Sequence, residues 1–264
     1  MRLGRHLKLI KSFFLYVLSR ETEFRTNFLV SFCIGLGWFL LFFIGLEVVF
    51  RHTDHLLGWT KWQVVFLLAL SYFFEDLVNT GFREGVMGLP ADIIRGNIDD
   101  VLVKPVDAQF FISFRKVSPI DFFDACFSLT LLVIVTYHAN LFVSWLGVVG
   151  FIVLLASGLA IAYGLAVVLA SLAFWWHGIE NIRYLFIAIT ESGKYPLEVL
   201  GKFGRPIVLT VVPSMVMVNF PAQAFFGRLE WYWYVYSLAL ALVWLVASRK
   251  FFLFALRRYS SASS

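Results

Sequence analysis

The stretch that decides the fold is ACFSLTLLVIVTYHANLFVSWLGVVGFIVLLASGLAIAYGLAVVLASLAFWW, residues 125–176, which contains no Asp, Glu, Lys or Arg. One helical crossing of a bilayer takes about 20 apolar residues, so this run is too long for a single crossing. His138 and Asn140 interrupt it. We therefore predict two membrane spans here, over about 118–137 and 142–175, and expect the glycines of the overlong second span to allow tilting, kinking or close packing.

The rest of the chain has the same character. Its 264 residues are 60% hydrophobic and 19% aromatic, with a mean hydropathy of +0.82, too apolar for the surface of a soluble globule. Further apolar runs cover 28–49, 62–81, 206–226 and 231–254. The sequence thus predicts an all-α polytopic membrane protein with about six transmembrane helices, folded as one domain over 1–264.

The N-terminal segment 1–26 has a different pattern. Leu3, Leu7 and Ile10 share one side of a helical wheel, while Arg5 and Lys8 lie on the other. This pattern is typical of an amphipathic helix lying in an anionic membrane surface. A solvated basic tail with chance periodicity is the alternative.

The distribution of basic residues indicates an orientation. Nearly all Lys and Arg fall in the two tails and in loops near 82–117 and 177–205, whereas the opposite side holds Arg51, Lys61 and Arg228. By the positive-inside rule both termini are predicted to be cytoplasmic, which requires an even number of crossings. Topology then accounts for the net charge of +5, and no nucleic-acid partner is needed.

The region 177–230 is ambiguous. Its prolines, Pro196, Pro206, Pro213 and Pro221, favour broken helices, which survive at membrane depth only where protein or a cavity shields their backbone. Residues 177–196 fit a cytoplasmic helix before a span at 206–226, but they also fit a short span followed by a broken re-entrant segment.

The cytoplasmic loop 82–117 contains IIRGNIDDVLVKPVDAQFF, residues 93–111. Asn97 is predicted to cap a short helix with Asp99 and Asp100 in its first turn, Lys104 at its end and Pro105 as its stop. One face is expected to dock on the membrane bundle and the other to meet the cytoplasm. The docking face would hold Ile94, Ile98, Val101 and Leu102, and the wet face Asp92, Arg95, Asp99 and Lys104. An ordinary solvated loop helix is the competing interpretation.

Three other functions compete with the one suggested by this loop, namely metal binding, hydrolysis and ion-coupled transport. His177 and Glu180 have a helical spacing but lack a third ligand for a metal. No G-x-S-x-G motif supports an intramembrane hydrolase. Glu75 and Asp76, near the end of the second span, offer a site for an ion- or proton-coupled secondary transporter. We therefore predict no catalytic or metal site in this chain, and keep the secondary transporter as the alternative function.

Several stretches resemble the permeases of type-2 ABC transporters, namely EFRTNF (23–28), GWTKWQVV (58–65), GLPADIIRGNIDDVLVKPVDAQFF (88–111) and KYPLEVLGKFGRPIVLTVVPSMVMVNFPAQAFFG (194–227). The resemblance implies a six-helix membrane subunit of an exporter in the bacterial cytoplasmic (inner) membrane, paired with an identical or related permease. It also implies a coupling helix that contacts a separate ATP-binding subunit through Asp92, Arg95, Gly96, Asn97, Asp99, Asp100, Lys104 and Pro105.

ATP chemistry is expected outside this chain. The sequence has no G-x-x-x-x-G-K-[ST] loop to cradle phosphates, so ATP and Mg²⁺ would be bound by the partner subunit and the chain would hold no cofactor. The residues that bind substrate are not identified, although an aromatic-rich interior suits an amphipathic molecule.

Single-cysteine labelling tests the predicted topology. Cysteines at Lys61 and Arg228 should react with a membrane-impermeant maleimide added outside the cell, because both positions fall on the side with few basic residues. Cysteine at Lys8 serves as the internal control and should react only after the membrane is opened. Cytoplasmic labelling at 61 or 228 would overturn the orientation.

Overall fold

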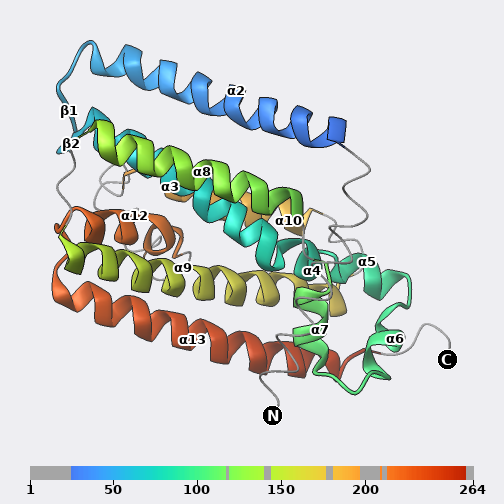
Figure 1. Ribbon diagram of the computed structural model, residues 1–264. Helices are drawn as coiled ribbons and strands as arrows, with labels where there is room; N and C mark the ends of the chain where they lie inside the picture. The colour runs from blue at the N-terminus through green and yellow to red at the C-terminus, as the bar shows by residue number, and fades with distance from the viewer. Residues whose placement is uncertain are drawn as a thin grey trace.

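A computed structural model describes residues 25–116, 119–139, 144–176, 181–196, 209 and 213–259. In this part the chain is all-α apart from one short hairpin, and the long helices run alongside one another (Figure 1). Five of them are long and apolar enough to cross a membrane, namely α2 (Arg25–Phe50), α3 (Lys61–Val78), α8 (Pro119–His138), α9 (Trp145–Ser171) and α13 (Trp231–Leu256). They match five of the six predicted spans within a few residues, so the polytopic membrane architecture is confirmed.

The two ends of the bundle differ. At one end lies the hairpin of β1 (His55–Leu56) and β2 (Trp59–Thr60), closed by Leu57 and Gly58, which both have positive φ as a two-residue hairpin turn requires. At the other end four short helices gather beside the C-terminal end of α13 (Figure 1). These are α4 (Glu84–Met87), α5 (Leu89–Ile94), α6 (Ile98–Leu102) and α7 (Ala108–Phe114), and residues 84–114 are called the cap below.

Helix α3 is the centre of the bundle. Every residue from Gln63 to Ser71 is buried, as expected of a helix that is apolar all round and enclosed by neighbours. Its axis continues through a π-helical turn, Asn79–Arg83, into α4. Buried polar atoms of Asn79, Thr80 and Arg83 in this turn have no partner among the described residues.

Helix α9 packs closely on two neighbours through glycine. A Cβ at Gly158 would lie 2.6 Å from the carbonyl oxygen of Met217 in α12 (Ser214–Phe225), and a Cβ at Gly164 would lie 2.8 Å from that of Trp244 in α13. Pro221 lies inside α12 and has no N–H, so it leaves the Met217 carbonyl without its usual intrahelical donor. Small residues let membrane helices approach in this way, and residues 172–174 then extend α9 as a 3₁₀ turn.

The region 177–230 forms two short helices where it is described. α10 (Ile182–Glu191) continues into the 3₁₀ turn Ser192–Lys194, and α12 follows later in the chain. Among the described residues of the expected span 206–226 is the 12-residue α12, which by itself is shorter than a full crossing. The His177 and Glu180 pair falls outside the described residues.

These two helices lie one after the other along α3. Arg183 at the start of α10 pairs with Glu84, and Lys194 lies 3.8 Å from Glu75. Near the hairpin end, Phe225 stacks on Phe66 with ring centroids 4.6 Å apart. Together α10, its 3₁₀ turn and α12 therefore run antiparallel to the axis that α3 and α4 share, in two pieces.

The joint between the two pieces is held by Asn219. This side chain is fully buried, and its Nδ2 donates to the carbonyl oxygens of Gly193 at 3.1 Å and Tyr195 at 2.9 Å. Ser192 Oγ also donates to Ser214 Oγ at 2.7 Å. The carbonyls at the end of the first piece thus receive hydrogen bonds from the second.

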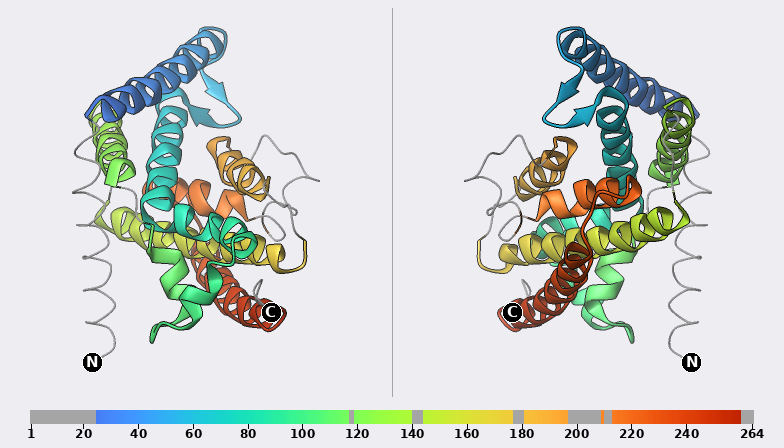
Figure 2. Two further views of the ribbon diagram at one scale, coloured as in Figure 1. Left: turned by 90° about the vertical axis from the view of Figure 1, so that its right-hand side faces the viewer. Right: turned by 90° about the vertical axis from the view of Figure 1, so that its left-hand side faces the viewer.

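Helix α2 stands at the edge of the bundle (Figure 2). Of its residues from Cys33 to Phe50 only Phe39 is buried; its ring lies edge-on to that of Tyr72 in α3. The predicted interface helix 1–26 lies outside the described residues, except that Arg25 and Thr26 begin α2.

Replacing Gly158 by Ala should destabilise the bundle, because the new methyl would meet the backbone of α12. Overpacking of this kind typically lowers the free energy of unfolding by about 1–3 kcal/mol. Gly37→Ala is the matched control, since a Cβ there has no atom within 4 Å. Thermal unfolding of the two variants in detergent checks the prediction, and equal melting temperatures would contradict it.

Candidate functional site

The cap begins with a tight reversal between α5 and α6. Gly96 has φ +73°, its N–H donates to the Ile93 carbonyl, and the Asn97 N–H donates to the Asp92 carbonyl at 2.9 Å. This pair of bonds is a Schellman motif with glycine at the left-handed position. Gly96 therefore serves to end α5 and turn the chain into α6.

The short predicted helix exists as α6, but its capping was predicted wrongly. Asn97 precedes the helix without a side-chain capping bond, and its Nδ2 instead donates to Asp92 Oδ1 at 3.4 Å. Asp99 and Asp100 do occupy the first turn of α6, where the helix dipole favours anions.

The docking face of α6 was predicted correctly at two positions and wrongly at two. Ile98 and Val101 are buried in the hydrophobic core. Ile94 and Leu102 are 52% and 45% exposed, and Val103 next to them is 82% exposed. The outward side of α6 therefore carries apolar side chains as well as charges.

Asp92 was predicted to face the cytoplasm, and the structure places it in the interior. Its side chain is 8% exposed and forms an ion pair with Arg115, which is 16% exposed. Arg115 also lies over the Phe111 ring, 5.9 Å from its centroid. A buried carboxylate needs such a partner, so Asp92 holds α5 to the chain after α7.

The remaining predicted site residues lie on the outside of the cap. Arg95, Asp100, Lys104 and Pro105 are exposed, and Lys104 Nζ sits 4.1 Å from the Phe111 ring centroid. Asp99 is half-buried beside Tyr259. Burial and the Asp99 carboxylate raise the pKa of Tyr259, which shows that α6 lies against the chain just beyond α13.

Polar contacts fasten the cap to α13, α9 and α10. Arg249 Nη1 in α13 donates to Asp107 Oδ1 at 3.0 Å, Gln109 Nε2 donates to Tyr163 Oη in α9 at 3.1 Å, and Glu84 pairs with Arg183. Partial burial acts to raise the pKa of Asp107, but hydrogen bonds from Arg249 and the Phe110 amide outweigh it and hold that pKa below its usual value.

Glu75 and Asp76, the basis of the alternative secondary-transporter function, point in different directions from α3. Glu75 faces α10 and pairs with Arg83 at 3.4 Å and Lys194 at 3.8 Å. Asp76 faces α8, where Ser128 Oγ donates to its Oδ2 at 2.7 Å. Their separation removes the basis for a two-carboxylate ion site, because neighbouring positions on a helix point about 100° apart.

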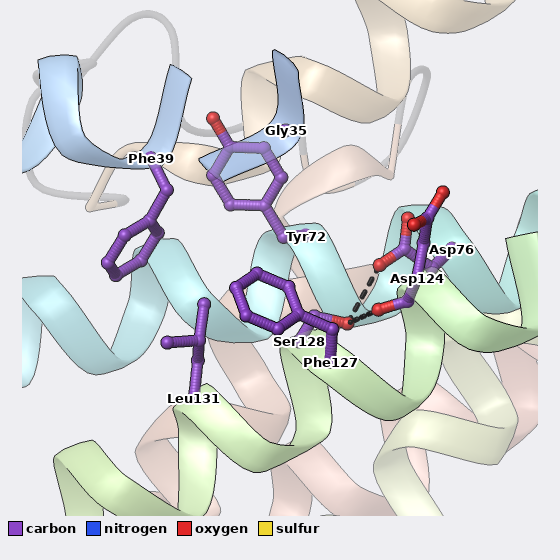
Figure 3. Close-up of a pocket in the computed structure, with 8 residues that line it drawn as sticks. All are labelled: Gly35, Phe39, Tyr72, Asp76, Asp124, Phe127, Ser128 and Leu131. Carbon is purple, nitrogen blue, oxygen red and sulfur yellow. Dashed lines mark hydrogen bonds between the residues drawn. The ribbon is translucent and has the colours of Figure 1, made fainter. Parts of the chain in front are cut away.

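Asp76 does line a small cavity between α2, α3 and α8. Figure 3 shows Asp76 and Asp124 close together, with Tyr72, Phe39 and Phe127 around the remaining walls. The cavity holds about 80 Å³, room for very few water molecules. Among the described residues, no three His, Cys, Asp or Glu side chains are arranged to hold a metal ion.

Three residues have structural roles that their sequence context did not predict, namely Arg115, Lys194 and Asn219. Arg115 and Lys194 were read only as cytoplasmic basic residues, although each pairs with an acid on a distant segment. Asn219 was quoted within the later matching stretch but given no role. Asn219 could have been found from the sequence, because it is a polar amide in an otherwise apolar run that also contains the helix-breaking Pro221.

Comparison with known proteins gives one result. A protein-family model described as "ABC-2 family transporter protein" matches residues 36–263, a range that includes the cap and all five long helices at least in part. No curated protein and no solved structure matches the chain.

Replacing Asp92 by Asn should destabilise the cap, because Arg115 would then be buried without a counter-ion. Breaking a buried pair in this way typically costs about 3–5 kcal/mol. The matched control is Asp100→Asn at an exposed position of the same loop. Limited proteolysis of the purified protein should cut the Asp92→Asn cap faster than either the control or the wild type. Equal cleavage rates in all three would mean that the pair contributes nothing.

Proposed function

Because the chain belongs to the ABC-2 family of transporter membrane proteins, we propose that it is the permease subunit of an ATP-driven exporter in the bacterial cytoplasmic membrane. It works as a dimer with an identical or related permease, and two ATP-binding subunits drive the pair. Membrane subunits of this family lack an ATPase domain. ATP and Mg²⁺ are therefore bound by the partner, and this chain converts the partner's motion into alternating access.

The observation that carries this proposal is the outward surface of α6. Its inner residues Ile98 and Val101 are anchored in the core, while Val103, Leu102 and Ile94 remain exposed beside Arg95 and Lys104. Contacts between proteins combine apolar side chains at their centre with charged side chains at their rim, and the exposed Leu102 and Val103, followed directly by the exposed Lys104, offer both kinds. We assign this surface to contact with the ATP-binding subunit.

The way the cap is attached supports a coupling role. Its ion pair with Arg249 leads to α13, its hydrogen bond with Tyr163 leads to α9, and its ion pair with Arg183 leads to α10. A displacement of the cap would therefore be transmitted to three membrane helices at once. Buried anchors at Ile98 and Val101 keep α6 from moving independently.

We place the cap end and both termini in the cytoplasm. Most basic residues of the described chain lie in or next to the cap, in the α10 segment, or at the end of α13 and just beyond it, as the positive-inside rule requires. The fifth crossing is then made by α10 and α12 in series, because together they follow the continuous axis of α4 and α3 from Glu84 to Phe66. With α2, α3, α8, α9 and α13, this gives an even number of crossings.

Charge reversal at Arg95 should uncouple the ATPase without unfolding the permease. In Arg95→Glu and Val103→Asp, a buried contact with the partner would gain an unpaired charge, at a cost of about 2–5 kcal/mol where the contact is fully desolvated. The ATP-binding subunit should then co-purify poorly and show little permease-stimulated hydrolysis, with permease abundance unchanged. The measurement is ATPase activity and co-purification from membranes that contain both subunits.

Two controls make that experiment decisive. Asp54→Lys changes an exposed residue at the hairpin end and should leave assembly intact. Ile98→Asp buries a carboxylate against the core, so permease abundance itself should fall. Normal assembly and normal stimulation in both Arg95→Glu and Val103→Asp would show that α6 is an ordinary solvated helix, and would overturn the proposed coupling.

A further inference from the structure

A second and larger cavity adjoins the Asp76 cavity, and Tyr72 lines both of them. It is an open cleft of about 680 Å³ between α2, α3 and the α10 segment with its 3₁₀ turn, a size typical of small-molecule sites. Its apolar walls are Trp38, Phe42, Tyr72 and Tyr195, and its polar lining includes Glu75, Glu191 and Lys194. None of these three charged residues belongs to the cap or to its proposed contact with the ATPase.

The charged side chains form a chain of ion pairs in which one acid remains accessible. Glu75 has two cationic partners, Arg83 and Lys194. Glu191 accepts from Lys194 Nζ at 2.8 Å, yet its side chain is 47% exposed, whereas that of Lys194 is 11% exposed. The polar group that the cavity offers to a ligand is therefore a carboxylate.

The aromatic lining also favours a positively charged ligand. Lys194 Nζ already lies 5.3 Å from the centroid of the Tyr72 ring, so this wall stabilises a cation through the negative face of the ring. Tyr195 is 52% and Trp38 55% exposed, which leaves both able to contact a ligand. Aromatic rings beside an acid are the usual recognition site of amine and quaternary ammonium groups.

The position of the cavity selects an amphipathic ligand. Glu75 is near the cap end of α3, about 20 Å along the helix from Lys61 at a rise of about 1.5 Å per residue, so its level lies in the cytoplasmic half of the membrane under the orientation proposed above. Trp38 and Phe42 belong to α2, whose other side chains from Cys33 onward are largely exposed. A ligand in this cavity can therefore keep an apolar tail beside α2 while its head group meets Glu191.

We propose that this cavity binds the positively charged head group of an amphipathic molecule, with Glu191 as its counter-ion and Trp38, Tyr72 and Tyr195 as its aromatic walls. The proposal rests on the transport function above, and names the class of substrate that the exporter takes from the cytoplasmic half of the bilayer. Lys194 is a competing internal cation, which a bound head group would partly displace from Glu191.

Binding to the full-length chain in neutral maltoside detergent tests the proposal. Rhodamine 6G, an amphipathic cation, is followed by fluorescence polarisation and then displaced by three surfactants with the same fourteen-carbon tail. Tetradecyltrimethylammonium should displace it at lower concentration than tetradecyl maltoside or tetradecyl sulfate. Equal displacement by the three would show that only the tail is recognised, and strongest displacement by the sulfate would reverse the assigned charge; either result overturns the proposal.

Substitutions locate the binding in this cavity. Glu191→Gln should weaken rhodamine 6G binding about tenfold, the loss expected for one contact to a charged group, and Trp38→Ala should weaken it by a smaller factor. Glu230→Gln, which removes an exposed carboxylate at the hairpin end, is the matched control and should bind as the wild type does. Wild-type affinity in both Glu191→Gln and Trp38→Ala would place the dye elsewhere.

Lys194→Gln tests whether Lys194 competes with the ligand for Glu191. Removing the competing cation should strengthen rhodamine 6G binding, provided that thermal unfolding shows the variant to be folded, and weaker binding by a folded variant would contradict the proposal. The assay contains no ATP-binding subunit, so its outcome is independent of α6. If Arg95→Glu and Val103→Asp leave stimulated hydrolysis unchanged while Glu191→Gln still loses dye binding, the coupling proposal fails and the binding site stands.

Discussion

The proposed fifth crossing depends on how a helix can be interrupted inside a membrane. A break exposes backbone carbonyls that water cannot reach in the bilayer core, and each unpaired group costs several kcal/mol. Here the carbonyls of Gly193 and Tyr195 are satisfied by one buried amide, that of Asn219. Because this bond joins α10 to α12, it also sets where Lys194 and Glu191 lie relative to α3. The way the break is sealed therefore helps to place the Glu191, Lys194 and Tyr195 side of the larger cavity.

The sequence predicts the long helices well, because a membrane span depends on a property of the whole segment. α2, α3, α8, α9 and α13 all coincide with apolar runs, and the burial of Ile98 and Val101 follows from their periodicity in α6. The failures concern single side chains. Asp92 looks like a surface acid in a polar loop until Arg115 is brought beside it, and Glu75 looks like a partner of Asp76 until Lys194 arrives from 119 positions away. Such pairings arise from tertiary packing, which no local pattern records.

The two proposed sites lie in different parts of the fold. The surface around Val103 belongs to the cap and faces away from the bundle, whereas the cavity around Glu191 lies between membrane helices. They are connected physically, because Arg183 begins the same helix that ends at Glu191, and Arg183 pairs with Glu84 of the cap. A shift of the cap would pull on α10 from one end while the Asn219 joint holds its other end. Two discrete positions of one helix are enough to link such sites.

The π-helical turn Asn79–Arg83 determines how a change in the number of residues in this segment would affect the fold. A π turn accommodates one residue more than the α-helix around it, and one residue in an α-helix corresponds to about 100° of rotation. The bulge takes up the extra residue locally, so the helix on either side of it stays in phase. A relative one residue shorter between Val78 and Glu84 would form a regular helix here and leave α4 facing as it does now, but it would lose the wide turn in which Asn79, Thr80 and Arg83 hold buried polar atoms without partners among the described residues. A deletion of one residue should therefore be tolerated better at this turn than in the middle of α3, where no bulge can take up the change.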